Sequence, residues 1–345
     1  MVNSRQTLDR LLQGQDLTEA QAAALLQLLT HPDLSPALAG AMLAALRAKG
    51  VTPAEVRGFA GAMRALARRP ALPNAANAID IVGTGGDGSG SLNLSTGAAL
   101  LAAACGMTVV KHGNRSVSSR SGSADLLEQL GFKMPLDEVM AARCLAATGF
   151  TFLFAPYFHP AMKTLAPIRS ALGVRTVFNL LGPLTNPAAP RFQLIGAYDA
   201  DAAALMADTL AGMDISRAWV VHGAAGWDEV TPIGPFIAFD VIPGKVQRLE
   251  VDPLQFGLKA CSAADLAGGD AAANAAALHA VFERRDRGPH CGALALQCGL
   301  ALYIAGASPS IAAGIDAARA TIESGRAERW LHDLKRFALA SAQAS

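Results

Sequence analysis

The chain has 345 residues, of which 52% are hydrophobic, 17% charged and 6% aromatic, and its formal net charge is +1. This composition is typical of globular proteins, and the length indicates about two domains of roughly 100 to 200 residues each. A near-neutral charge argues against a nucleic-acid surface spread over the whole molecule. The five cysteines form no CxxC pair, so we expect reduced, packed thiols rather than a disulfide scaffold or a metal site.

Neither export nor membrane insertion is indicated. The first six residues lack the basic start and apolar core of a secretory signal. Two uncharged runs, 88–110 and 291–315, contain Ser, Asn, Gln or Pro residues, so we interpret them as helices buried inside the protein. We therefore expect a cytoplasmic protein that does not contact a membrane.

Residues 1–71 have the pattern of a helical module. Thr18-Glu19-Ala20-Gln21 matches a capping box, and Ser35-Pro36 and Thr52-Pro53 each place a proline just inside a helix start. Gly50 is expected to end the third helix. A stretch with two prolines then interrupts the periodicity, which places a domain boundary near residue 72.

From residue 72 onward, short β-like runs alternate with longer helical ones, as in α/β domains. A local antiparallel hairpin is expected around Pro243-Gly244-Lys245. Helices are expected again from about residue 274. The expected strands are 79–82, 107–110, 150–154, 192–198, 218–221, 236–242 and 246–251.

A glycine-rich turn, 83–88, follows the first expected strand and precedes a helix over 96–104. Glycines let backbone N–H groups approach an anion, and the helix N-terminus adds partial positive charge, so phosphate is the natural ligand. The turn also matches the GxGxxG motif of dinucleotide-binding proteins, but that motif expects an acidic residue about 20 positions on. No Asp or Glu lies between Asp87 and Asp125. A tight turn without a ligand remains the alternative.

The segment 111–123 follows the second expected strand and contains Lys111, Arg115, Arg120 and five serines, with no acidic residue. Parallel strands deliver their following loops to the same edge of a sheet, where open α/β sheets bind ligands. Together with the glycine-rich turn, this loop predicts a cationic pocket rich in hydroxyl and amide groups. A solvated surface loop is the alternative.

Two further segments carry charge near expected strand ends. Asp228-Glu229 follows the strand 218–221, and adjacent carboxylates beside phosphates suit Mg²⁺, although such a pair alone is usually surface charge. Arg169 follows the polar segment 159–163 and could bind a carboxylate with its planar guanidinium. A structural role in a helix is the alternative for Arg169.

These segments together resemble the anthranilate phosphoribosyltransferase family. The resemblance runs in order along nearly the whole chain, through 83–96, 111–125, 159–163 and 178–187. The family transfers the phosphoribosyl group of 5-phosphoribosyl 1-diphosphate (PRPP) to the amine of anthranilate, releasing pyrophosphate, in tryptophan biosynthesis. It uses Mg²⁺, needs no covalent nucleophile and is usually a homodimer.

The resemblance implies a fold like those of nucleoside phosphorylases. A small all-helical N-terminal domain, 1–71, would be joined to a larger α/β domain, 72–345, with a central, mainly parallel sheet flanked by helices. Residues 165–186, approximately, would pack on the helical domain. The active site would lie in the cleft between the domains and bind small molecules, without nucleic acid or membrane as a partner.

The resemblance also implies three groups of site residues. Those for PRPP are Gly83, Gly86, Asp87, Ser91, Asn93, Ser95, Thr96, Lys111, His112, Gly113, Asn114, Arg115, Ser116, Val117, Ser118, Ser119 and Ser123. Those for anthranilate are Gly83, Asn114 and Arg169, the last toward the carboxylate, with His112, His159 and Met162 along the acceptor's path. Those for Mg²⁺ are Ser95, Asp228 and Glu229.

The chain departs from the family's commoner form around Asp228-Glu229, where the neighbours are 225–227 and 230–233. Two other functions stay open. A pyrimidine nucleoside phosphorylase shares the architecture, but the complete 111–119 loop and the 159–163 segment favour the transferase. A non-catalytic nucleic-acid-binding relative is disfavoured by the acidic pair and by the low net charge.

Overall fold

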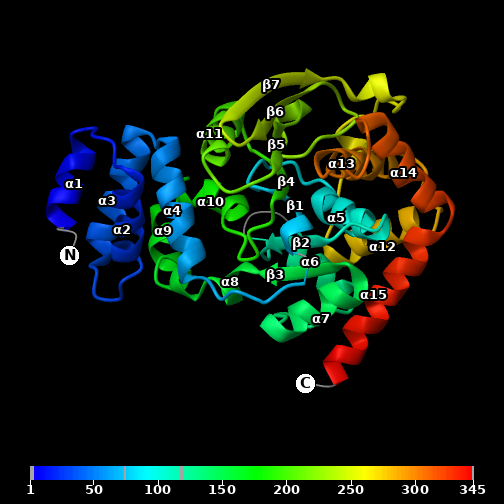
Figure 1. Cartoon of the computed structure of the whole chain (residues 1–345), viewed down its shortest axis with the longest axis horizontal. Helices are drawn as coiled ribbons and strands as arrows, with labels where there is room; N and C mark the ends of the chain where they lie inside the picture. Colours follow the sequence, from blue (N-terminus) through cyan, green and yellow to red (C-terminus); the bar gives the residue numbers. More distant parts are fainter. Residues whose placement is uncertain (1–3, 74, 117–119, 344–345) are drawn as a thin grey trace.

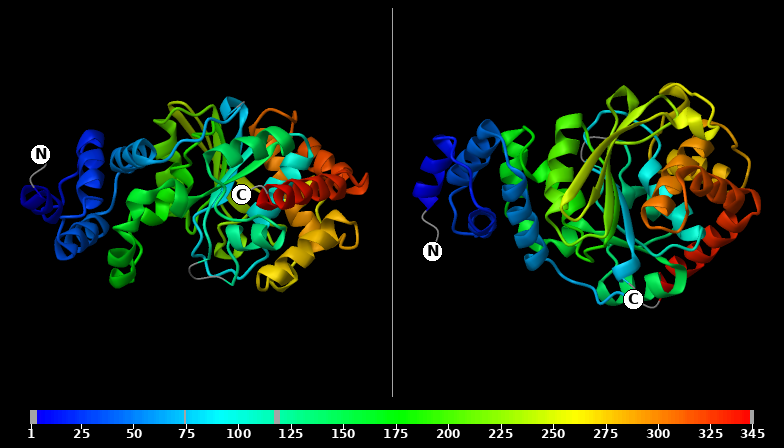
Figure 2. Two further views of the ribbon diagram at one scale, coloured as in Figure 1. Left: turned by 90° about the horizontal axis from the view of Figure 1, so that it is seen from below. Right: turned by 45° about the horizontal axis from the view of Figure 1, so that its top comes forward.

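The computed structural model describes residues 4–73, 75–116 and 120–343 (Figure 1). The helices α1 (Ser4–Leu12), α2 (Glu19–Leu29), α3 (Pro36–Lys49) and α4 (Pro53–Leu66) lie at one end of the molecule, away from the C-terminal helices (Figures 1 and 2). The predicted helix boundaries are confirmed. Thr18 forms a capping box with Gln21, proline starts α3 and α4, and Gly50 caps the end of α3.

The described residues form one sheet of seven strands in the order β3-β2-β1-β4-β5-β6-β7. The strands β3, β2, β1, β4 and β5 are parallel, whereas β6 and β7 are antiparallel. Their bounds are β1 (Ile79–Gly83), β2 (Val109–Gly113), β3 (Phe150–Phe154), β4 (Phe192–Gly196), β5 (Arg217–His222), β6 (Phe236–Ile242) and β7 (Lys245–Val251).

All seven expected strands are present, with one clear shift. The second strand was expected over 107–110 but begins at Val109 and continues to Gly113. Met107 lies in the turn that ends α5 (Leu94–Ala104), where its N–H donates to the Ala102 carbonyl and Gly106 has a φ of 99°. The expected hairpin is confirmed, because β6 and β7 pair from Ile242 and Lys245 outward.

Helices cover both faces of the sheet (Figure 1). In the described chain the uncharged runs form α5 and α13, and no helix is long and apolar enough to cross a membrane. The remaining helices are α6 (Ser123–Gln129), α7 (Glu138–Thr148), α8 (Ala155–Phe158), α9 (Ala166–Leu172), α10 (Phe178–Leu184), α11 (Ala200–Ala211), α12 (Ala271–Phe282), α13 (Pro289–Ile304), α14 (Ile311–Glu323) and α15 (Arg326–Gln343).

The alternation of side chains along β1 separates two apolar cores. Ile79 and Ile81 pack with α5 and α13, while Val82 packs on the opposite face with α10 and α11. The second core also contains the buried side chains of α2, α3 and α4. The N-terminal helices therefore share their core with one face of the sheet, and Leu165 and Phe178 belong to the same core.

Close contact between α13 and α14 depends on Gly299 and Gly314, because a Cβ on Gly314 would overlap the Gly299 carbonyl. We expect Gly314→Ala to lower the free energy of unfolding by about 1–3 kcal/mol through overpacking. Gly61→Ala is the matched control, since Gly61 lies in α4 with no atom near its would-be Cβ. Urea denaturation measures both. Equal stability of the two variants would contradict this packing argument.

Candidate active site

The order of the strands predicts where a ligand binds. From β1 the chain proceeds to β2 and β3 on one side, and then returns to β4 and β5 on the other side. Ligands of open α/β sheets bind at such a reversal, outside the carboxyl ends of the strands. A cavity of about 1010 Å³ lies there, lined by the residues that follow β1, β2, β3 and β5 and by the 159–185 region.

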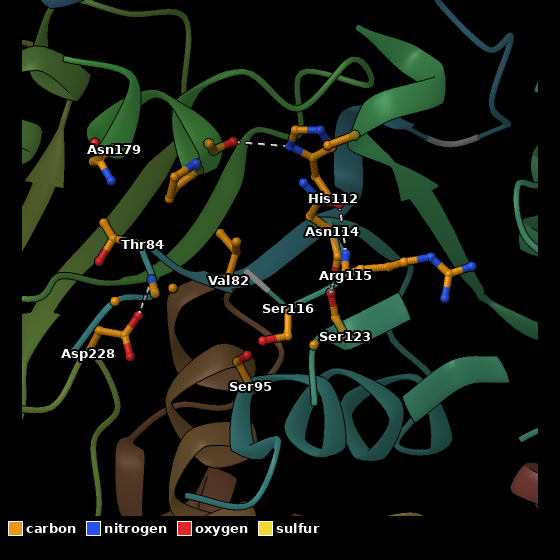
Figure 3. A pocket seen from close by; sticks show the side chains of 18 of the residues that line it. Val82, Thr84, Ser95, His112, Asn114, Arg115, Ser116, Ser123, Asn179 and Asp228 are labelled. Carbon is orange, nitrogen blue, oxygen red and sulfur yellow. Dashed lines mark hydrogen bonds between the residues drawn. The ribbon is translucent and has the colours of Figure 1, made fainter. Parts of the chain in front are cut away.

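Every site residue expected from the sequence that the structure describes lines this one cavity (Figure 3). The prediction that the loops after β1 and β2 meet at one sheet edge is thereby confirmed. Val117, Ser118 and Ser119 lie outside the described residues. The lining residues are Gly83, Gly86, Asp87, Ser91, Asn93, Ser95, Thr96, Lys111, His112, Gly113, Asn114, Arg115, Ser116, Ser123, His159, Met162, Arg169, Asp228 and Glu229.

The glycine-rich turn, which the structure extends over 83–90, is fastened at its base. The Thr84 N–H donates to the Gly196 carbonyl at 2.9 Å, and the Gly85 N–H donates to Asp228 Oδ2 at 2.6 Å. Gly196 must be glycine, since a Cβ there would overlap the Asp228 carbonyl. The segment around Asp228 therefore crosses directly over the ends of β1 and β4. This position places the Asp228 carboxylate against the glycine-rich turn.

Asp228 and Glu229, the acidic pair, are held by backbone donors on the cavity wall. Glu229 Oε1 accepts from the Ser95 N–H at 3.0 Å, and Asp87 Oδ2 accepts from the Asp228 N–H at 3.1 Å. Burial raises the pKa of Asp228 well above its ordinary value, and the charges of Glu229 and Asp87 raise it further. Burial likewise raises the pKa of Glu229 to about 7.

Such crowded carboxylates fit a divalent cation, because a cation would relieve their repulsion and oxygen donors suit Mg²⁺. Ser95 adds a hydroxyl next to Glu229. Within the described ranges, no three His, Cys, Asp or Glu side chains converge as a metal site. A Mg²⁺ ion here would therefore need substrate oxygens and water to complete its coordination, as Mg²⁺ commonly does.

The atypical loop around the acidic pair turns sharply and still presents both carboxylates to the cavity. Ala225 and Gly226 have φ angles of 62° and 78°. The Gly223 N–H donates to the Trp227 carbonyl at 2.8 Å, and the Trp227 side chain is buried in the main core. Core packing therefore anchors the loop immediately before Asp228.

Lys111 is a buried cation beneath this acidic wall. Its Nζ donates to the Ile81 carbonyl and lies 3.4 Å from Ser95 Oγ. Burial lowers the pKa of Lys111, and the negative charges of Asp80, Glu229 and Asp228 oppose that change. The ammonium group therefore depends for its compensation on a carboxylate from β1 and on the two carboxylates after β5.

Asp80 in β1 ties the region before β4 to the sheet. Asn186 Nδ2 donates to Asp80 Oδ2 at 2.8 Å and to the Val110 carbonyl at 2.9 Å. Burial raises the pKa of Asp80 to about 6, although Lys111 and Asn186 lower it. This buried network sets the position of α10 relative to β1 and β2.

Two histidines form the wall between the phosphate side and α10. The rings of His112 and His159 are edge to face with centroids 5.1 Å apart, and His112 Nδ1 lies 3.0 Å from the Gly182 carbonyl. Burial lowers the pKa of His112 to about 3 and that of His159 to about 4. Both rings are therefore neutral at pH 7, and both have a buried Nε2 without a hydrogen-bond partner among the described residues.

Arg169 supplies a cation on the far side of the cavity. Its guanidinium carbon lies 5.3 Å from the centroid of the Phe178 ring, and burial lowers its pKa. Across the described chain, no carboxylate forms an ion pair with this side chain. A half-buried guanidinium next to an aromatic ring suits a planar carboxylate ligand.

The 111–123 loop has no acidic residue of its own, but two acids that follow it in sequence compensate Arg115 in the structure. Arg115 donates to both oxygens of Glu128 at 2.5 Å and to Asp125 Oδ1 at 3.1 Å. The two acids lie in α6, two and five residues after the end of the loop in sequence and beside it in space. The Arg115 side chain consequently extends away from Ser95 and Asp228 (Figure 3).

Several lining residues were not expected from the sequence. Thr84 and Asn179 face the cavity (Figure 3), and Thr84 Oγ1 is buried without a partner among the described residues. Met63 enters from α4 and Arg175 from the α9 to α10 connection. An arginine in a glycine-containing connection was a detectable signal for Arg175, whereas Met63 has the pattern of an ordinary core residue.

Comparison with known proteins defines the class first. The family model for the "Glycosyl transferase family, helical bundle domain" matches residues 5–67, and the model for the "Glycosyl transferase family, a/b domain" matches residues 75–328. The helical bundle and the α/β sheet are therefore those of a glycosyl transferase of this family.

Similar proteins and structures identify the family within this class. Anthranilate phosphoribosyltransferase from Chloroflexus aggregans is 47% identical over 255 residues, covering 74% of this chain and 75% of the relative. The crystal structure of the enzyme from Thermus thermophilus has a TM-score of 0.90 and 41% identity, covering 96% of this chain and 99% of that chain. The Saccharomyces cerevisiae enzyme, in complex with PRPP and Mg, has a TM-score of 0.88 at 27% identity, covering 98% of both chains. The chain belongs to the anthranilate phosphoribosyltransferase family.

The neutral histidines make stability depend on pH. His159 has a folded pKa of about 4, below the ordinary value of about 6.5. The unfolded chain therefore takes up a proton first as the pH falls through 6.5, and stability is lost between pH 6.5 and 4. From pH 7 to 5, this histidine should remove about 2 kcal/mol of stability.

The variant His159→Gln isolates this contribution, because the opposite effects of Asp80 and Glu229 are common to both proteins. The free energy of unfolding of the wild type minus that of the variant should fall by about 2 kcal/mol between pH 7 and pH 5. Urea denaturation at the two pH values provides the measurement. A pH-independent difference would show that His159 takes up a proton equally readily in the folded and unfolded protein, so that burial does not lower its pKa.

Proposed function

We propose that the protein transfers the 5-phosphoribosyl group of PRPP to the amine of anthranilate, giving N-(5-phosphoribosyl)anthranilate and pyrophosphate. One observation carries the proposal. A single cavity combines the glycine-rich turn, the buried Lys111 and the acidic pair on one side with Arg169 and neutral histidines on the other. One side suits a diphosphate with its metal, and the other suits an aromatic carboxylate.

On the donor side, the glycine-rich turn and the start of α5 would bind the diphosphate through backbone N–H groups and hydroxyls, since both features favour anions. Asn93 has a supporting part, because its side chain bonds to Ser121 and Asn274 and so joins the start of α5 to the 111–123 loop. Ser91, Thr96 and Ser123 line the same side. Lys111 would add positive charge near the leaving group.

Asp228, Glu229 and Ser95 would hold Mg²⁺. The bound ion supplies charge neutralisation for the diphosphate as it leaves the ribose. The protein's own contribution is to place this negative wall at a fixed distance from Lys111, so that the leaving group meets charges already in position. The serine N–H that donates to Glu229 fixes the direction of one carboxylate.

On the acceptor side, Arg169 would pair with the carboxylate of anthranilate, and Asn114 and Gly83 would lie near its amine. His112, His159 and Met162 would form the wall along the acceptor's path. Because both histidines are neutral, they would add no positive charge near a ribose carbon that becomes positive. An arylamine is already unprotonated near neutral pH, so no strong base is needed.

The proposal includes the division into residues 1–71 and 72–345, with residues 165–186 on the helical side. In support, Leu165, Phe178 and Leu181 share a core with α2, α3 and α4. It also includes a homodimer and a cytoplasmic location, as the family resemblance implies. Sedimentation velocity of the purified protein tests the dimer.

The decisive experiment follows the loss of anthranilate fluorescence on mixing the protein with PRPP and Mg²⁺, with each component omitted in turn. Loss that requires all components, with formation of the phosphoribosyl product and pyrophosphate, supports the proposal. A folded protein that consumes no anthranilate, but cleaves a pyrimidine nucleoside with phosphate, would replace it with the phosphorylase alternative.

Arg169→Ala should raise the KM for anthranilate by roughly 10- to 100-fold, as expected for loss of a charge-assisted hydrogen bond worth about 1.5–3 kcal/mol. The KM for PRPP should change little, because Arg169 lies on the acceptor side. Steady-state kinetics with each substrate varied separately provides the measurement. Arg191→Ala is the control, since Arg191 pairs with Asp214 at the surface. An unchanged KM for anthranilate would remove Arg169 from the acceptor site.

Asp228→Asn combined with Glu229→Gln should lower kcat/KM at least about 100-fold and raise the Mg²⁺ concentration needed for half-maximal activity. The substitutions are nearly isosteric and remove repulsion within the pair, but they also remove negative charge that compensates the buried Lys111. The thermal unfolding midpoint is therefore measured to verify that the variant is folded. Activity is measured against Mg²⁺ concentration, with Asp265→Asn as the control because the exposed Asp265 carboxylate accepts hydrogen bonds from Ser262 alone among the described residues. Wild-type metal dependence would show that the pair does not bind the ion.

A further inference from the structure

Arg175 lines the cavity and has no role in the function described so far. Its NH2 group donates to the Gly86 carbonyl at 2.5 Å, and its guanidinium carbon lies 3.9 Å from the centroid of the Tyr198 ring. Arg175 comes from the α9 to α10 connection, Gly86 from the glycine-rich turn and Tyr198 from the residues after β4. One side chain therefore joins three segments that are distant in sequence.

The part of the turn that Arg175 holds has few other restraints. Its base is tied to Gly196 and Asp228, as described above, but Gly85, Gly86, Gly88 and Gly90 all have positive φ angles, between 60° and 75°. Glycine in such conformations has the largest backbone freedom to lose on ordering. A hydrogen bond from a guanidinium to the middle of this run therefore restricts the segment that would otherwise vary most.

The contact also sets the direction of a backbone donor. In a trans peptide the carbonyl and the following N–H point in opposite directions. With the Gly86 carbonyl turned toward Arg175, the Asp87 N–H points away from Arg175, and within the described chain it has no hydrogen-bond partner. A free N–H in a glycine-rich turn is the kind of donor that binds a phosphate oxygen.

Stacking on Tyr198 keeps the guanidinium in place. A guanidinium over an aromatic face is attracted to it, and its planar shape lets it stack and donate a hydrogen bond together. The Tyr198 side chain is half-buried, and burial raises its pKa, so the phenol stays neutral near pH 7. The ring therefore serves as an uncharged support for Arg175.

We propose that Arg175 is a positioning residue that holds the glycine-rich turn, through the Gly86 carbonyl and the Tyr198 ring, in the conformation that binds the diphosphate of PRPP. The inference rests on the proposed function for the identity of the substrate. Because the turn is already ordered in the free protein, PRPP binding does not have to order it. Arg175 therefore affects the binding of PRPP rather than the chemical step.

Arg175→Met, which keeps length but removes charge and donors, should raise the KM for PRPP roughly tenfold, as for loss of one charged hydrogen bond. The kcat at saturating PRPP and the KM for anthranilate should stay within about twofold. Arg175→Lys should recover part of the PRPP affinity, because lysine keeps a donor but does not stack as a plane. Steady-state kinetics and the thermal unfolding midpoint are measured for each variant.

Tyr198 provides a second test through the aromatic support. Tyr198→Leu should raise the KM for PRPP in the same direction, whereas Tyr198→Phe, which keeps the ring face, should not. The effects of Arg175→Met and Tyr198→Leu should be less than additive, since both remove the same arrangement. Arg191→Met, at the surface pair with Asp214, is the control for removing an arginine.

Binding is also measured without turnover, as the PRPP concentration that gives a half-maximal thermal shift in the presence of Mg²⁺. An Arg175→Met protein with wild-type PRPP affinity, or with equal increases in the KM for both substrates, overturns the inference. If the wild type binds PRPP but consumes no anthranilate, the proposed function fails while the Arg175 comparison still decides this inference. If the wild type neither binds PRPP nor turns over, both fail.

Discussion

The structure depends on mutual compensation of charges that β1, β2 and the segment after β5 bring together inside the protein. Lys111, in the middle of β2, is compensated by Asp80 of β1 and by the acidic pair after β5. Lys111, Asp80 and Asp228 are buried, and Glu229 is partly buried. A buried charge without its partner is strongly destabilising. The three loops consequently cannot shift independently, which keeps an open, charged cavity at the edge of an otherwise apolar sheet.

The reversal of strand order between β1 and β4 gives the cavity two chemically different sides. The turn after β1 and the start of α5 present backbone donors and hydroxyls, whereas the 155–186 region brings the neutral His159, Phe178 and Arg169. Asn186, bonded to Asp80, fastens this second side to the first. A phosphate ligand and an aromatic carboxylate can therefore be bound next to each other without sharing the same contacts.

Particular elements show how far sequence reasoning extends. Local signals were reliable, as the Thr18 capping box, the Pro243-Gly244 hairpin and the strand 150–154 demonstrate. The second strand was placed too early because a helix-ending turn uses the Met107 N–H. The 111–123 loop was interpreted as uncompensated because the acids that pair with Arg115 belong to the following helix. Charge compensation depends on which side chains lie close together in space, and counting the charges within one segment of sequence does not show this.

By itself, the sequence determined the helical and α/β parts, the order of the strands along the chain and the residues that match a known family's motifs, because these follow from periodicity, caps and short motifs. Only the tertiary structure decided that Asp228 passes over Gly196, that the histidines are neutral and that Arg175 reaches Gly86 across 89 positions of sequence. These features arise from close approach and burial, which depend on how the sheet brings distant segments together and have no local signature.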